Sequence, residues 1–226
     1  MVGTKIETDQ HLSEFKLLCH CLQLTSIQSL DLSGTGMGAE ALEIFARLLP
    51  PKLVDVTIDS VTLTVARELD LKKMDISKRH VPLLREWLRK PDVLAILESL
   101  DLDQNEKLCG GVDPETGEVV PDGDVGTFKQ VCDALKGTKV KRLCVRNTGM
   151  GSESASVLAD LIKTMPFIVV NASATGSKSG ISLGDPETSV KDAMELLQDG
   201  FVDREHWYTL AEKLMELPSL IVVFQA

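Results

Sequence analysis

The chain has 226 residues, of which 43% are hydrophobic and only 4% aromatic, so an aliphatic core is expected. Its formal net charge of −10 disfavours binding to the phosphate backbone of nucleic acids. No apolar run is long enough to span a membrane, and the first residues show no secretory signal. The five cysteines have no disulfide-framework spacing. We therefore expect a cytoplasmic protein with reduced thiols.

The first predicted element is a helix over residues 9–23, which would cap one end of the fold. Its buried face is predicted from apolar residues at helical spacing: Phe15, Leu18, Cys19 and Leu22. The tripeptide Cys19-His20-Cys21 has the density of a metal-ligand set. However, Cys19 belongs to the apolar face, and no second ligand pair has suitable spacing. A core cysteine is favoured over a structural zinc site.

Residues 27–38 have the sequence IQSLDLSGTGMG, and a similar motif, VKRLCVRNTGMG, recurs at residues 140–151. In both copies apolar residues occupy positions 1, 4, 6 and 11, and a threonine occupies position 9. This strand pattern predicts a short strand followed by a tight turn. A Gly-rich turn before a helix is also typical of dinucleotide-binding loops. Because the turn recurs, a structural role for its glycines is favoured over nucleotide binding.

Further copies of the strand pattern begin at Leu53, Ala66, Leu97 and Phe167, and a last strand is expected near 220–224. Helical apolar stripes separate them: 42–49, 84–88, 128–135, 155–162, 190–197 and 207–214. The distance from the start of the strand motif to the following helical stripe is the same in both copies, and one full repeat spans about 27 residues. This regular spacing indicates a solenoid. The unit at Leu53 is too short for a helix and is interpreted as a helix-less unit or a β excursion.

Two insertions interrupt the pattern at what should be the same edge of the fold. The first, residues 109–126, is rich in Gly and Pro. Its segment GEVVPDGD (117–124) is expected to form a small hairpin or a projecting loop. The second covers residues 171–189. Long loops on a rigid scaffold are often functional, although the alternative is that these loops are mobile and have no binding role. The candidate binding residues of the first insertion are Asp113, Glu115, Asp122 and Asp124.

Motifs for catalysis or for tight metal binding are not recognised. Asp101, Asp103 and Asn105 resemble the start of an EF-hand loop, but the required Gly and Glu are replaced by Glu106 and Val112. Weak cation binding by the acidic insertion stays open. The four histidines fall in no nucleophile motif, and no phosphate-binding loop occurs. We expect no catalytic residues and no cofactor.

Residues between the apolar positions should line the open face of the strands, because side chains alternate along a strand. Positions 5 and 7 then predict an acidic row with a basic end: Asp31, Asp59, Asp70, Asp101, Asp103, Arg142 and Arg146. Such a surface suits a polypeptide with basic side chains. A solvated surface of mixed charge is an equally weighted alternative.

The segments LDLSGTGMGAEALEIFARLL (30–49) and LCVRNTGMGSESASVLADLI (143–162) resemble leucine-rich repeats of the ribonuclease-inhibitor-like family. The usual Asn or Cys at position 9 is often Thr here, so hydroxyls are expected to bond the turn backbone. The resemblance implies an α/β solenoid of five or six irregular units, with a curved parallel sheet inside and helices outside. A single domain would cover 1–226, with the repeats at 27–175 and atypical repeats and a cap at 176–226.

The resulting hypothesis is a monomeric, non-enzymatic interaction module or scaffold that binds a protein partner through its concave face and insertions. The alternative implied by the resemblance is a regulator of another enzyme, either an inhibitor or a GTPase activator. Arg142 and Arg146 are the first candidates for a stimulatory arginine in that case.

Overall fold

Strands and helices alternate along residues 12–165 and 168–171, the part of the chain that the computed structural model describes. The helices are α1 (Leu12–Gln23), α2 (Ala39–Arg47), α3 (Val81–Leu88), α4 (Pro91–Ile96), α5 (Val125–Leu135) and α6 (Ser152–Thr164). The strands are β1 (Ser29–Asp31), β2 (Asp55–Ile58), β3 (Val61–Thr64), β4 (Glu68–Asp70), β5 (Ser99–Asp101), β6 (Gly111–Val112), β7 (Val119–Val120), β8 (Arg142–Cys144) and β9 (Val169–Asn171). The elements predicted for 172–226 lie outside the described residues.

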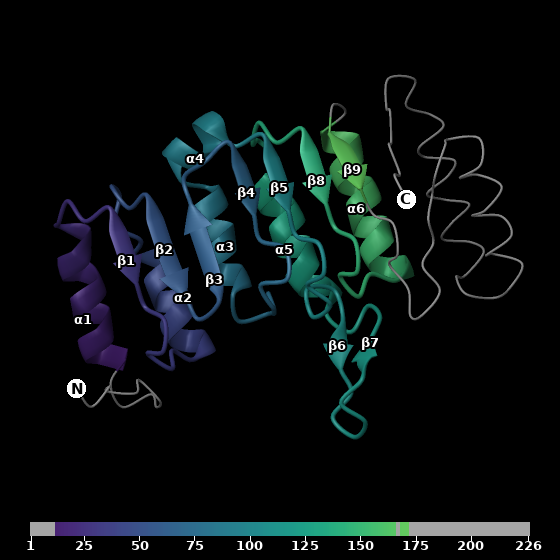
Figure 1. The fold of residues 1–226 in the computed structure, drawn as a ribbon, viewed down its shortest axis with the longest axis horizontal. Helices are drawn as coiled ribbons and strands as arrows, with labels where there is room; N and C mark the ends of the chain where they lie inside the picture. Colours follow the sequence, from purple (N-terminus) through teal and green to yellow (C-terminus); the bar gives the residue numbers. More distant parts are fainter. Residues whose placement is uncertain (1–11, 166–167, 172–226) are drawn as a thin grey trace, which may run out of the picture.

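The main sheet is parallel, with the strand order β4-β5-β8-β9. Its register aligns the residues that occupy position 4 of the strand pattern: Leu69, Leu100, Leu143 and Val170. In Figure 1 the strands stand side by side in one row, and α2, α3, α5 and α6 lie behind them. The fold is therefore mixed α/β, as the alternating strand and helix patterns predicted.

The core lies between the strands and the helices. Leu100 and Leu143 are fully buried at the centre of the main sheet, and each such side chain contributes about 1.5–3 kcal/mol of burial free energy. The stripe predicted for α5 is confirmed, because all its members are buried: Phe128, Val131, Cys132 and Leu135. The prediction for Leu18 on α1 was wrong, since it is 51% exposed. As the end helix, α1 contacts α2 on one side and buries a narrower face.

The turns after the strands share one backbone geometry. Position 8 of the strand pattern has positive φ in four places: Gly34, Lys73, Gln104 and Asn147. Gly36 and Gly149 repeat this at position 10, so the recurring glycines serve the turn, as expected. The Thr35 hydroxyl donates to the Leu32 carbonyl at 2.7 Å, and Thr148 bonds Val145 in the same way at 2.9 Å. Hydroxyl bonding at position 9 is thus confirmed in these two turns.

The expectation of a parallel sheet throughout was wrong near the Leu53 unit. Strand β2 pairs in parallel with β1 but in antiparallel with β3, and these strands form a sheet separate from the main one. The reason is the tight turn at Asp59 and Ser60, where Asp59 adopts positive φ and reverses the chain. The β excursion, rather than a helix-less unit in a continuous sheet, is therefore the correct interpretation.

The 109–126 insertion forms the antiparallel hairpin β6-β7, which projects from one edge of the row of strands (Figure 1). A hairpin forms, but the bounds predicted from 117–124 were wrong. Its strands are 111–112 and 119–120, because residues 113–118 form the turn and 117–124 supply only the second strand. Among the helices of the described ranges, no segment has the length and apolar character needed to cross a membrane.

Candidate functional site

The candidate site is the strand face that points away from the helices. Leucines in the middle of β4, β5 and β8 are buried, so their neighbours on either side face outward. The sheet register aligns the residues at position 5: Asp70, Asp101, Cys144 and Asn171. A second line, at position 3, contains Glu68, Ser99 and Arg142. Of the predicted row, the main sheet brings together Asp70, Asp101 and Arg142, while Asp31 lies on β1 in a separate sheet. We call the outward side of these strands the strand face.

Aspartates of the strand face each perform a local task. One carboxylate oxygen accepts the backbone N–H of the residue two places further on, which fixes the start of the turn. The bonds are Asp31 to Ser33 (2.8 Å), Asp70 to Lys72 (3.0 Å) and Asp101 to Asp103 (2.8 Å). Asp31 and Asp70 are exposed and Asp101 is partly exposed. Turn formation therefore leaves these carboxylates accessible to a partner.

Two of these carboxylates are direct neighbours, since Asp70 and Asp101 are paired in the register of β4 and β5. Burial raises the pKa of Asp101, and the negative charges of Asp103 and Asp70 raise it further, while the Asp103 N–H and the nearby positive charge of Lys72 lower it in part. Like charges directly opposite one another in a sheet are destabilising. A cationic side chain between the two would relieve this repulsion, so the geometry favours basic ligands.

Asp103 was expected to face a partner, and this prediction was wrong. Its side chain is only 1% exposed and forms an ion pair with Arg146, with Nη2 at 2.5 Å and Nε at 2.7 Å from Oδ2. Its Oδ1 accepts the Arg146 backbone N–H at 2.7 Å. In that unit Cys144 replaces the aspartate of position 5, so Asp103 from the preceding unit supplies the missing acceptor. Arg146 is consequently engaged within the protein, whereas Arg142 is exposed.

Asp59 is also placed elsewhere. It lies in the β2-β3 turn, forms an ion pair with Arg79, and has its Oδ2 3.6 Å from Nε2 of His80. The imidazole of His80 is buried, and its Nδ1 accepts the Ser77 backbone N–H at 3.2 Å. Burial lowers the pKa of His80 to about 4. Asp59 therefore fixes a turn against the segment before α3 and does not extend the acidic row.

The ligand atoms of Asp101, Asp103 and Cys144 lie within 4.8 Å of one another, which is the spacing of a metal site. However, Asp103 is committed to Arg146, and burial raises the pKa of the Cys144 thiol to about 11. A protonated thiol and a neutralised carboxylate are poor ligands. The EF-hand resemblance also fails, because the Asn105 amide bonds backbone groups of two adjacent turns.

The Cys19-His20-Cys21 tripeptide forms no ligand pair. Cys19 is fully buried and Cys21 is exposed, so the two thiols face different surroundings. Burial raises the pKa of Cys19 to about 11, as expected for a core thiol. All five cysteines are free.

Two of the insertion carboxylates cap helices. Asp124 accepts the Thr127 backbone N–H at 3.1 Å and caps α5. Asp122 reaches the start of α6, where it accepts N–H groups of Gly151 (2.9 Å), Glu153 (2.8 Å) and Ser154 (3.0 Å). A carboxylate at this end also benefits from the helix dipole. These two residues therefore serve the fold, while Asp113 and Glu115 lie near the tip of the hairpin.

The sequence prediction missed the outward line at position 3, including Glu68. The sequence could have predicted this line, because residues two places apart on a strand lie on the same face and position 3 is two places before position 5. Arg142 was found from its charge. Comparisons with protein-family models and with curated proteins find no match for this chain.

Proposed function

We propose that the chain is a leucine-rich-repeat module of the ribonuclease-inhibitor-like kind. Three observations support this assignment: the aligned leucines of the main sheet, the positive φ that recurs at position 8, and the polar side chains at position 9 that bond the turns. The β2-β3 hairpin and the β6-β7 insertion would then be departures from a regular solenoid. Solenoids of this kind commonly bind through the surface of their strands.

The function that the geometry supports best is non-enzymatic capture of a protein partner by the strand face. The observation that carries this proposal is the pair of adjacent carboxylates, Asp70 and Asp101, at the centre of an outward polar surface. Glu68 adds negative charge on the same face, and the exposed Arg142 lies on β8, the strand next to that of Asp101. The expected partner presents basic side chains toward β4 and β5.

A non-enzymatic role is consistent with the chemistry of the candidate nucleophiles, because burial raises the pKa of both Cys19 and Cys144 to about 11. The free thiols suit a reducing compartment, so we place the protein in the cytoplasm. For the regulator hypothesis, the ion pair with Asp103 disfavours Arg146 as a stimulatory residue.

The test is affinity purification with quantitative mass spectrometry, comparing the wild type with the double variant Asp70→Asn and Asp101→Asn. Asparagine keeps the oxygen that bonds the turn N–H, so the variant removes charge while retaining the fold. Asp160→Asn on the exposed face of α6 is the matched charge control. We expect partners captured by the wild type and by the control to fall at least tenfold with the double variant. Equal capture by all three proteins would reject the proposal.

A further inference from the structure

The β6-β7 hairpin has a firmly held base. A side-chain carbon at Gly149 would meet the Gly110 Cα at 2.7 Å, so the two backbones are in close contact. The Cys109 N–H donates to the Thr148 carbonyl at 2.9 Å, and the Asp122 carboxylate joins the hairpin to α6. The hairpin is therefore pre-organised, and a ligand would not have to order it.

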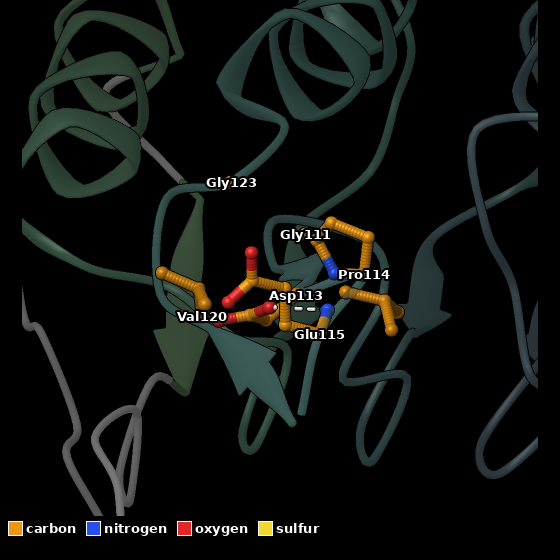
Figure 2. Close-up of a pocket in the computed structure, with 7 residues that line it drawn as sticks. Gly111, Asp113, Pro114, Glu115, Val120 and Gly123 are labelled. Atoms are coloured by element: carbon orange, nitrogen blue, oxygen red, sulfur yellow. Dashed lines mark hydrogen bonds between the residues drawn. The ribbon is translucent and has the colours of Figure 1, made fainter. Parts of the chain in front are cut away.

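A shallow hollow of about 470 Å³, open to solvent on one side, lies on this hairpin. Its lining consists of Gly111, Val112, Asp113, Pro114, Glu115, Val120 and Gly123. Val112 is 50% exposed and Val120 is 46% exposed, although both are apolar. In Figure 2 the side chains of Asp113 and Glu115 lie between Val120 on one side and Pro114 on the other. The hollow thus combines apolar walls with two carboxylates.

The carboxylates of this hollow keep acceptor capacity. Asp113 Oδ1 accepts the N–H groups of Glu115 (2.7 Å) and Thr116 (3.3 Å), so neither of these bonds uses its Oδ2. These backbone bonds lower the pKa of Asp113, so it is ionised at neutral pH. Both acidic side chains are within reach of the apolar lining. A long basic side chain fits this pattern, because its methylene stem covers apolar surface while its charge meets a carboxylate.

We propose that the hairpin hollow is a second docking site, independent of the strand face, for a peptide segment that pairs basic with aliphatic side chains. The basic groups would contact Asp113 and Glu115, and the aliphatic groups would cover Val112 and Val120. Charge complementarity selects this occupant, since an acidic or purely apolar segment would leave the two carboxylates without a counter-charge.

The experiment is a titration of the ¹⁵N-labelled full chain, followed by NMR, with a synthetic hexapeptide of alternating Lys and Leu. A twin peptide with Gln in place of Lys is the ligand control. We expect saturable shifts of the amides of Val112, Val120 and Gly123 with the Lys peptide. The double variant Asp113→Asn and Glu115→Gln should weaken this binding at least tenfold, because it removes both charges while the introduced asparagine keeps the oxygen that bonds the turn. The matched control Glu118→Gln, on the hairpin but outside the lining, should change the affinity less than twofold.

The proposal is overturned if the Gln peptide binds as well as the Lys peptide, or if the double variant keeps wild-type affinity. It is also overturned if Ca²⁺ alone shifts the same amides, which would indicate a cation site. The strand-face variant Asp70→Asn with Asp101→Asn should leave the hairpin shifts unchanged. This variant separates the two proposals, because it should abolish capture by the strand face without changing peptide binding at the hairpin. If the strand-face variant also lost peptide binding at the hairpin, the hairpin would not be an independent site.

Discussion

The strand face and the insertion both carry aspartates, yet they use them differently. On the strand face Asp31, Asp70 and Asp101 each accept one N–H of their own turn and stay open to solvent. In the insertion, Asp122 and Asp124 accept N–H groups at the starts of α6 and α5. A count of acidic residues therefore overstates the surface that a partner can use.

The difference follows from the backbone groups that each region leaves without partners. A helix start exposes up to four N–H groups, so a nearby carboxylate is drawn fully into the fold. A strand-to-turn junction exposes one N–H group, so the carboxylate there accepts a single backbone bond and keeps its other oxygen available. Asp103 is an intermediate case, because it bonds Arg146, which follows the neighbouring strand β8, and is itself buried beneath that partly exposed side chain. Four predictions probe this contrast, in order of decreasing effect.

Replacing Asp103 by Ala should have the largest effect on stability, a loss of about 4 kcal/mol. The change leaves the Arg146 guanidinium without its counter-ion and its backbone N–H without an acceptor. Urea denaturation at neutral pH measures the loss. Asp103→Asn should lose about half as much, because it keeps the acceptor for the N–H. Stability equal to the wild type in both variants would contradict the structural role of Asp103.

Acidification should destabilise the protein through His80. Its pKa is about 4 in the folded protein against 6.5 ordinarily, because of burial and the charge of Arg79, with Asp75 acting in the opposite direction. Between these two pH values His80 is protonated in the unfolded chain and neutral in the folded protein. The free energy of unfolding therefore falls as pH drops from 6.5 toward 4. The loss attributable to His80 should approach about 3 kcal/mol near pH 4.

The measurement is thermal unfolding of the wild type and of His80→Asn across this pH range. Asparagine can accept the Ser77 N–H but does not titrate. The variant should show a shallower decline with acid. Identical pH profiles for the two proteins would show that His80 is not the responsible group.

Replacing Asp122 by Ala should cost about 2 kcal/mol, the upper end for a helix cap, because three N–H groups at the start of α6 lose their acceptor. Hydrogen exchange at residues 111–120 should quicken, since the same carboxylate holds the hairpin. Asp70→Ala is the comparison and should cost well under half as much, because it loses a single exposed bond. Similar losses for the two variants would remove the distinction between the regions.

The substitution Gln104→Gly should stabilise the protein by about 1 kcal/mol. Gln104 adopts a φ of 60°, which is unfavourable for a residue with a side chain. The opposite change at the same position of the first turn, Gly34→Ala, should destabilise it, because Gly34 adopts a φ of 69°. Both effects are measured as shifts in melting temperature. A destabilising Gln104→Gly would contradict the shared turn geometry.

The apolar pattern predicted most of the strands and helices because burial depends on local periodicity. Leu100, Leu143 and the α5 stripe are buried as their spacing requires. The β excursion was one of two interpretations left open, but the antiparallel direction of β3 was not predicted, since the Asp59 turn reverses the chain without disturbing the apolar spacing. Chain direction is decided by turn geometry, which periodicity does not contain.

The site was predicted less well, because contacts distant in sequence decide which charges stay exposed. The Asp124 cap has a local signal, an aspartate three residues before Thr127 at a helix start. The Asp122 contact with α6 has none, since its partners lie far along the chain. The Asp103 pair could have been found from the opposite charges of Asp103 and Arg146 at position 7 of adjacent units.

The most direct test of the strand face is an NMR titration of the labelled protein with the Lys-Leu peptide, read at the amides of Lys72 and Asp103. Each amide donates to a strand-face carboxylate and reports its occupation. We predict saturable shifts at both amides in the wild type and in Asp160→Asn, and their loss in the Asp70→Asn and Asp101→Asn double variant. Shifts that persist in the double variant, or that spread over the exposed faces of the helices, would contradict a binding role for the strand face.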